Sequence, residues 1–243
     1  MGKEYRTGMA SPVEIDHNHQ LNHDRDIMDK LAARQQMVDQ QIRTWEVLDP
    51  RVLGALSAVP REAFVPPEYR ELAFADAPIP VGFGQAMLAP KVQGRILQAL
   101  GINVRDTVLE VGTGSGYLSA CLSLLGGATH SIDIHAGLVA MAQANLRAVP
   151  DARVQVEVRD AFDAAPLGEF DVIAVTGSLP IYDSRFERLL RVGGRLFAVV
   201  GSAPVMDAVL VRRVDGDEWI RESLFETVID PLINATAAQK FVF

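Results

Sequence analysis

A glycine-rich turn carries the clearest chemistry in this sequence. The apolar run Val108–Val111 leads into the residues Gly112, Thr113, Gly114, Ser115 and Gly116. A helical pattern follows from Tyr117. Glycines in such a turn let the backbone bend tightly and let a ligand approach it closely at the carboxyl end of a strand. The turn therefore predicts a bound nucleoside.

Three acidic residues stand at the ends of successive predicted strands. Glu110 directly precedes the glycine turn, and Asp133 lies about 20 residues further on, where an acid commonly receives a ribose diol. Asp160, followed by Ala161, ends the third strand. The carboxyl ends of parallel strands share one edge of a sheet, so we expect these acids to surround one ligand.

The spacing of the glycines indicates which nucleoside is bound. A dinucleotide-binding turn reads G-x-G-x-x-G and places a pyrophosphate over a helix N-terminus, whereas this turn reads G-x-G-x-G. A carboxylate at Glu110 is badly placed for a pyrophosphate and well placed for a cationic amino group. S-adenosylmethionine (SAM) has an amino group, a sulfonium, a ribose and an adenine, and no phosphate. We expect Glu110, Asp133 and Asp160 to face its amino, ribose and adenine ends, respectively.

The elements that would position these residues alternate between strands and helices. Strands are predicted at 107–111, 129–134, 154–158, 171–175 and 195–200, and helices at 91–100, 117–125, 137–149 and 184–190. This alternation favours an α/β, Rossmann-like, doubly wound and mostly parallel sheet. Two further strands around the Asp-Gly turn after Val214 predict an antiparallel hairpin at the C-terminal edge.

The N-terminal region reads differently from this body. Residues 1–26 are polar, and we expect a disordered tail whose histidines, His17, His19 and His23, bind no metal. Residues 27–89 predict two helices and a long irregular loop, the second helix beginning at Asp49-Pro50. Leu31, Met37, Val38, Gln41, Ile42 and Trp45 follow the helical spacing of the first. With the body at 90–243, residues 27–243 are expected to form a single domain.

Composition narrows the possible partners and the location. Of 243 residues 49% are hydrophobic, and the single cysteine, Cys121, excludes an intramolecular disulfide and a multi-cysteine zinc site. No stretch approaches the ~20 apolar residues of a membrane span. A net charge of −8 repels phosphate backbones and anionic membranes. We therefore expect a cytoplasmic protein that binds neither nucleic acid nor membranes.

Several motifs occur in a family-specific order: VPREAFVP, IPVGFGQ, VLEVGTGSGY, FDVIAVTGSLP and LLRVGGRLFAVVG. With them the chain resembles the protein-L-isoaspartate O-methyltransferase family from about Ala32 to Gly201. The resemblance implies transfer of the SAM methyl group to the free α-carboxylate of an isoaspartyl residue, a step in protein repair. It also implies that Gly112, Gly114 and Gly116 wrap the cofactor, that Asp133 holds the ribose and that Asp160 faces the adenine.

One stretch departs from the family pattern. After Gly-Gln the family usually has Thr-Ile-Ser, whose hydroxyls help to seat the substrate carboxylate, but here Gln85 is followed by Ala86, Met87 and Leu88. Lys91 stands where the family often has His. Three hypotheses stay open: an isoaspartyl methyltransferase, a methyltransferase for a different and less charged acceptor, and a non-catalytic SAM-binding protein.

The substrate side offers candidates but no nucleophile. A carboxylate acceptor is ionised near pH 7, so methyl transfer needs alignment and exclusion of water rather than a strong base. Donors and lining groups are expected on the loop before Pro90 and just after the fourth strand. The candidates are Gly84, Gln85, Leu88, Thr176 and Ser178.

Overall fold

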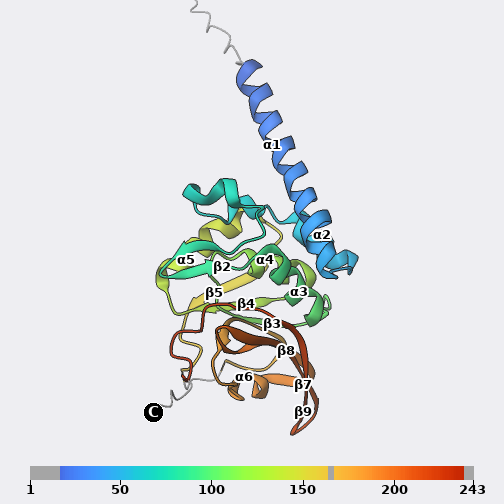
Figure 1. Cartoon of the computed structure of the whole chain (residues 1–243), viewed down its shortest axis with the longest axis vertical. Coiled ribbons are helices and arrows are strands. Elements are labelled where there is room, and N and C mark those ends of the chain that lie inside the picture. The colour runs from blue at the N-terminus through green and yellow to red at the C-terminus, as the bar shows by residue number, and fades with distance from the viewer. Residues whose placement is uncertain (1–16, 164–166, 238–243) are drawn as a thin grey trace, which may run out of the picture. The chain divides into compact units, whose positions relative to one another are not determined.

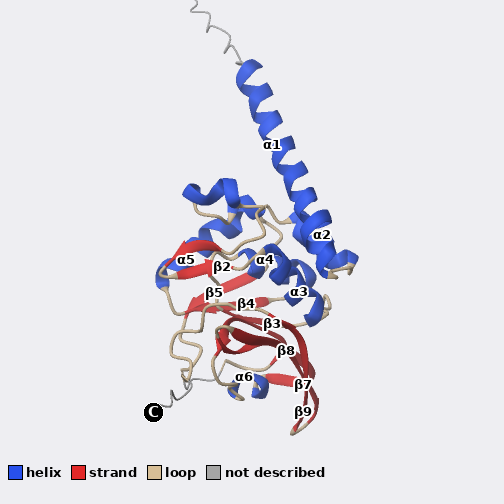
Figure 2. Cartoon of the chain, viewed as in Figure 1, coloured by secondary structure: helices blue, strands red, loops and turns tan. Residues whose placement is uncertain are grey.

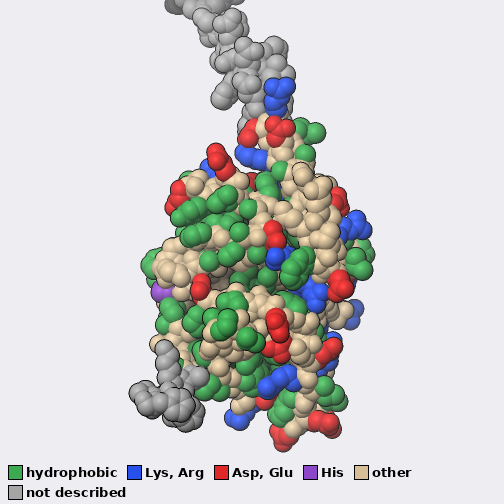
Figure 3. Space-filling model, in the orientation of Figure 1, with side chains coloured by type: hydrophobic (Ala, Val, Ile, Leu, Met, Phe, Trp, Pro, Cys, Tyr) green, Lys and Arg blue, Asp and Glu red, His purple; other side chains and the backbone are tan. Residues whose placement is uncertain are grey.

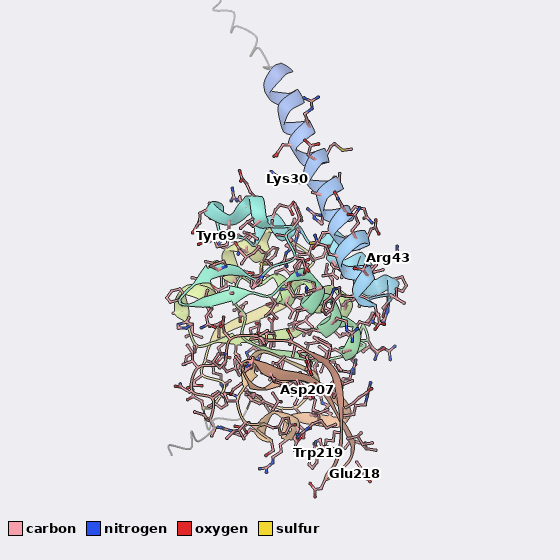
Figure 4. The ribbon with its side chains drawn as sticks, viewed as in Figure 1. Lys30, Arg43, Tyr69, Asp207, Glu218 and Trp219 are labelled. Carbon is pink, nitrogen blue, oxygen red and sulfur yellow. The ribbon has the colours of Figure 1, made fainter. Side chains whose placement is uncertain are left out.

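The computed structural model describes residues 17–163 and 167–237 of the chain. The chain divides into two units, residues 1–33 and 34–243. The first contains most of helix α1 (His17–Met37), which carries Lys30 (labelled in Figure 4). Lys30 forms an ion pair with Asp26 one turn away. Residues 17–26, expected as part of a disordered tail, are therefore helical. Residues 1–16 and the side chains of the histidine tract lie outside the described part.

The second unit is built on a mixed sheet of seven strands (Figures 1 and 2). Its order is β5-β4-β3-β6-β7-β8-β9, and pairing is parallel from β5 to β7 and antiparallel from β7 to β9. The strands are β3 (Val108–Val111), β4 (Thr129–Asp133), β5 (Val154–Val158), β6 (Phe170–Leu179), β7 (Leu190–Ser202), β8 (Val205–Asp215) and β9 (Glu218–Glu226). The predicted fold class and edge hairpin are confirmed.

Apolar side chains on both sheet faces form two cores. Along β6, Val172 and Ala174 enter one core while Ile173 and Val175 enter the other, because successive side chains of a strand point to opposite faces. The first core includes residues of α2 (Pro50–Ala58), α3 (Pro90–Leu100) and α4 (Tyr117–Leu125). The second includes Phe186 of the short helix α6 (Arg185–Arg188). Helix α5 (Ala136–Asn145) packs beside β4 and β5.

Some predicted boundaries were wrong. Strand β6 runs four residues past its predicted end at Val175, and β7 is longer than predicted at both ends. Both strands are longer than predicted because they pair with neighbouring strands, which a local sequence pattern does not reveal. Strand β7 is hydrogen-bonded to β6 on one side and to β8 on the other. The helix predicted over 137–149 ends at Asn145 and continues as a 3₁₀ turn, Leu146–Ala148.

The N-terminal helical region contains one break in spacing. After α1 the chain forms a π-helical turn, Val38–Ile42, and a 3₁₀ turn, Arg43–Trp45. The π-helical and 3₁₀ segments have a different number of residues per turn from an α-helix, so the residues at the predicted helical spacing do not all face the core. Met37, Val38 and Ile42 are buried, but Trp45 is 40% exposed. Leu31, in the first unit, is 48% exposed. Helix α2 begins as predicted, with the Asp49 carboxylate accepting from the Arg51 amide at 2.8 Å.

The stretch predicted as an irregular loop contains regular structure. Two 3₁₀ turns, Arg61–Ala63 and Pro67–Leu72, are followed by a hairpin of β1 (Ile79–Gly82) and β2 (Gln85–Met87). Phe83, with a φ of 55°, stands at the hairpin tip between Gly82 and Gly84. Among the described helices, none has both the length and the apolar character to cross a membrane.

Candidate functional site

A cavity of about 220 Å³ lies at the carboxyl ends of the parallel strands. It sits where the strand order reverses, between β3 and β6, which is where open α/β sheets bind ligands. Its walls come from the glycine turn, the ends of β4, β5 and β6, the β1–β2 hairpin, and the C-terminal segment Val228–Ile233.

The glycine turn forms one wall and depends on the absence of side chains. Gly112, Gly114 and Gly116 have positive φ values of 99°, 54° and 85°. A Cβ on Gly112 would lie 2.4 Å from Oγ1 of Thr176. Thr176 itself donates to the Gly112 carbonyl at 2.8 Å, which holds the turn against β6.

Asp133 is fixed beside this turn. It is 8% exposed, and its Oδ2 accepts from the Gly114 amide at 3.0 Å while Oδ1 accepts from the His135 amide at 2.9 Å. Each carboxylate oxygen keeps a further lone pair. Two main-chain bonds thus hold an acceptor at the cavity wall, in a geometry suited to a diol.

Asp160 and Ala161 line the same cavity. The Asp160 carboxylate accepts from the Phe162 amide at 2.9 Å and from Nδ2 of Asn234 at 2.7 Å. Asp160 therefore links the end of β5 to the chain beyond the last strand. The structure brings Asp133, Asp160 and the glycine turn together, as the sequence predicts.

Glu110 does not line this cavity. It is fully buried, and its Oε2 accepts from the hydroxyls of Ser119 and of Ser131, the latter at 2.6 Å, while Oε1 has no partner among the described residues. Burial raises the pKa of Glu110 to about 7, against the effect of the two hydroxyls. Glu110, expected to face the amino group of the cofactor, thus lies outside the walls of the main cavity.

Glu110 instead lines a smaller cavity of about 40 Å³ behind the glycine turn. Thr113 and Ser115 also line this smaller cavity rather than the main one. Gly116 lines neither cavity; it is the N-cap residue before α4 and packs against Ala142.

The substrate-side candidates divide into two groups. Gln85, Leu88 and Thr176 line the main cavity, and so does Ala86. Gly84 is exposed at the hairpin tip and does not line it. Ser178 is buried, and its hydroxyl donates to the Ile229 carbonyl at 3.2 Å, so it anchors the C-terminal segment instead of facing the cavity.

Two parts of the wall were not identified from the sequence. His135 lines the cavity and stacks on Phe83, with ring centroids 4.9 Å apart. The segment Val228–Ile233 is held along β6, where the Leu232 amide donates to the Ser178 carbonyl at 2.9 Å. No local pattern marks either contact, although His135 stands only two residues after Asp133.

Two other singled-out residues lie outside the cavity walls. Lys91 forms an ion pair with Asp76 at 2.7 Å, and its ammonium lies 4.4 Å from the centroid of the Trp45 ring. Cys121 is buried, and burial raises the pKa of its thiol to about 12, so it packs as a small apolar side chain.

Comparison with known proteins places this site in context. Residues 32–236 match the family model described as protein-L-isoaspartate(D-aspartate) O-methyltransferase (PCMT). The protein-L-isoaspartate O-methyltransferase of Koribacter versatilis is 36% identical over 201 residues, covering 82% of this chain and 90% of the relative. Protein-L-isoaspartate O-methyltransferase 1 of Rhodopseudomonas palustris is 37% identical over 204 residues, covering 83% of each.

Solved structures agree on the fold. A Plasmodium falciparum structure of the protein-L-isoaspartate O-methyltransferase class, in complex with S-adenosyl-L-homocysteine, superposes with a TM-score of 0.71 at 18% identity, over 82% of this chain and 97% of that one. Another structure, named protein-L-isoaspartate O-methyltransferase, gives 0.68 at 20% identity, over 82% and 65%.

Proposed function

The chain belongs to the protein-L-isoaspartate O-methyltransferase family, and we propose that it methylates the free α-carboxylate of isoaspartyl residues in damaged proteins or peptides, with SAM as methyl donor. One observation carries the assignment of the cofactor. A glycine turn of the G-x-G-x-G type and two fixed carboxylates, Asp133 and Asp160, share one cavity at the switch point of the sheet. SAM supplies an electrophilic methyl group on a cationic sulfur.

The cavity residues fit such a cofactor. Asp133 has lone pairs left to accept from a ribose diol, and Asp160 with Ala161 stands at the adenine end. The glycine turn gives close backbone access because Gly112 and Gly114 carry no Cβ. Glu110, enclosed behind the turn, acts through the packing of that turn.

On the acceptor side, the protein's task is to hold a carboxylate in line with the methyl group and to exclude water. Gln85 supplies an amide donor from the hairpin. Thr176 positions the glycine turn through its bond to the Gly112 carbonyl. The segment Val228–Ile233 lines the site with the side chains of Val228, Ile229, Leu232 and Ile233 and with Asp230. No group of this chain has to remove a proton, because the acceptor is ionised near pH 7.

A second candidate function is favoured by the same wall. Ala86 and Leu88, which replace the family's usual hydroxyl residues, line the cavity together with Val228, Ile229 and Leu232. An apolar wall suits a less charged acceptor. A purely SAM-binding, non-catalytic role is the third possibility.

The test is incubation of the full chain with labelled SAM and an isoaspartyl peptide, with the aspartyl peptide of identical sequence as control. The proposed function predicts a base-labile methyl ester on the isoaspartyl peptide alone. No ester on that peptide, together with normal S-adenosylhomocysteine binding and methylation of another acceptor, would support the second candidate. Activity that appears only in the Ala86→Thr/Leu88→Ser variant would also support it. Binding without methylation of any acceptor would support the third.

Partners and location extend this proposal. We expect a protein or peptide partner rather than a nucleic acid, given the net charge of −8. On the face shown in Figure 3, acidic and basic side chains are interspersed among hydrophobic ones. A cytoplasmic location stays a prediction from the composition.

A further inference from the structure

A fully buried arginine lies behind the acceptor side of the cavity. Arg61 is 0% exposed and donates to three separate segments of the chain. Its Nε bonds to the Ala73 carbonyl at 2.8 Å, its Nη2 to the Leu88 carbonyl at 2.9 Å, and its Nη1 to Oε1 of Gln93 on α3. The guanidinium also lies 4.9 Å from the centroid of the Tyr117 ring, at the start of the helix after the glycine turn.

No carboxylate in the described part of the chain forms an ion pair with this guanidinium; every acceptor it bonds is neutral. The nearby Arg34 has its own counter-ion in Glu62. Burial lowers the pKa of Arg61, but an arginine in a protein stays protonated. Burial also raises the pKa values of Tyr117 and Cys121, so both of these neighbours are neutral near pH 7.

The Arg61 guanidinium lies one layer of residues behind the wall of the main cavity on which the methyl acceptor is expected to bind. Leu88, whose carbonyl accepts from Arg61, lines both the main and the smaller cavity. Gln93 and Tyr117 line the smaller one, which shares Ala86 and Thr176 with the main cavity. A buried charge without a counter-ion is costly, and its field is weakly screened, so it favours an anion nearby.

We propose that Arg61 is a specificity-determining positioning residue: it fixes the Leu88 segment, and its unneutralised charge makes the acceptor side favourable for a carboxylate. The inference rests on the proposed function and deepens it. It explains how an anionic acceptor is accommodated beside Ala86 and Leu88, which offer no hydroxyl. Arg61 acts through Leu88 and through its field and does not touch the acceptor.

The substitution Gln93→Glu tests the charge directly. Glutamate keeps the shape of glutamine and the oxygen that accepts from Arg61, but it neutralises the guanidinium. In assays with an isoaspartyl peptide we expect KM to rise about tenfold, the effect of one charge felt across a layer of protein. Affinity for S-adenosylhomocysteine, measured by calorimetry, and the thermal midpoint should not fall, because the variant keeps the hydrogen bond and adds a counter-ion.

Two variants separate charge from packing. Gln155→Glu makes the same substitution at an exposed position on the edge strand β5, and KM should stay at the wild-type value. Gln93→Met removes the acceptor without adding charge. It should lower the thermal midpoint and raise KM less than Gln93→Glu does.

The outcomes distinguish this role from the proposed function. A wild type that forms no ester on the isoaspartyl peptide removes the proposed function and the role that rests on it. An active wild type with the same KM in Gln93→Glu and Gln155→Glu removes only the role of Arg61. Equal losses of peptide and cofactor affinity in Gln93→Glu would show a structural effect and would also overturn it.

Discussion

Replacement of Glu110 by glutamine should remove a large part of the pH dependence of stability. Glu110 is fully buried, and burial raises its pKa from 4.5 to about 7 in the folded protein. That rise corresponds to about 3 kcal/mol of free energy. Below about pH 4.5 the carboxyl is protonated whether the chain is folded or unfolded, so it contributes no pH dependence there.

Whether stability rises or falls with pH depends on which state, folded or unfolded, binds the Glu110 proton more tightly. Between about pH 4.5 and 7 the unfolded chain loses the proton while the folded protein keeps it, so the free energy of unfolding falls as pH rises. Above about pH 7 the folded protein ionises as well, and the loss levels off at about 3 kcal/mol. Glutamine at this position cannot titrate, and its profile should lack this decline.

The absolute stability of the variant also follows from the contacts. The amide oxygen of Glu110→Gln can accept from Ser119 and Ser131, which places its NH₂ group at the buried position where Oε1 has no described partner. An unsatisfied buried donor costs about 1–3 kcal/mol. The variant should therefore be less stable than the wild type near pH 5 and equal or more stable near pH 8.

Urea unfolding of both proteins from about pH 5 to about pH 8.5 measures the difference. Glu218→Gln is the matched control, because Glu218 is an exposed acid at the start of β9 (Figure 4) and loses the same charge. Its profile should parallel that of the wild type. If the Glu110→Gln profile also ran parallel to the wild type, burial of Glu110 would not govern its titration, and the reasoning would be refuted.

Three further substitutions probe the walls of the main cavity. Asp133→Ala should weaken S-adenosylhomocysteine binding about 10- to 100-fold in calorimetry, since hydrogen bonds to a charged group contribute about 1.5–3 kcal/mol; an unchanged affinity would exclude Asp133 as a ligand. Gly112→Ala places a Cβ 2.4 Å from Thr176 Oγ1, at a residue whose φ is 99°. It should therefore lower both the thermal midpoint and the affinity for the cofactor. The double variant Gly112→Ala/Thr176→Ala should recover only part of this loss, because the backbone strain at position 112 remains. Gly137→Ala places a Cβ 2.3 Å from the Phe83 ring, so it should displace the hairpin tip from His135 and lower the thermal midpoint. The double variant Gly137→Ala/Phe83→Ala should regain the lost thermal stability. If the loss persisted in the double variant, the contact between position 137 and Phe83 would not be its cause.

The sequence located Gly112, Gly114, Asp133 and Asp160 on the cavity wall because the patterns that mark them are local. Strand β5 and helix α4 have the predicted bounds, and Asp133 and Asp160 lie where their strands end. The direction of the Glu110 side chain could not be predicted in the same way. It lies on a strand buried on both faces, and only the packing of α4 and β4 places Ser119 and Ser131 beside it.

The acceptor half depends on contacts between distant parts of the chain. Phe83 reaches His135 only because the predicted loop is a hairpin whose tip packs against Gly137. The segment Val228–Ile233 has no periodic pattern, and its position is set by main-chain bonds to Ser178. Periodicity carries no information on either contact, which is why these walls were missed.

The two halves of the cavity therefore tolerate different substitutions. The glycine turn and Asp133 constrain one another through a main-chain bond and positive φ angles, and Thr176 holds the turn against β6, so few substitutions there preserve the site. On the acceptor side, Arg61 holds Leu88 by its carbonyl, a bond that any side chain at position 88 allows. Side chains at 86 and 88 can therefore differ from the family pattern while the backbone path and the buried charge stay in place. If the charge of Arg61 makes the site prefer a carboxylate, loss of the family hydroxyls weakens the binding of that carboxylate. The preference for a carboxylate over an uncharged acceptor then remains.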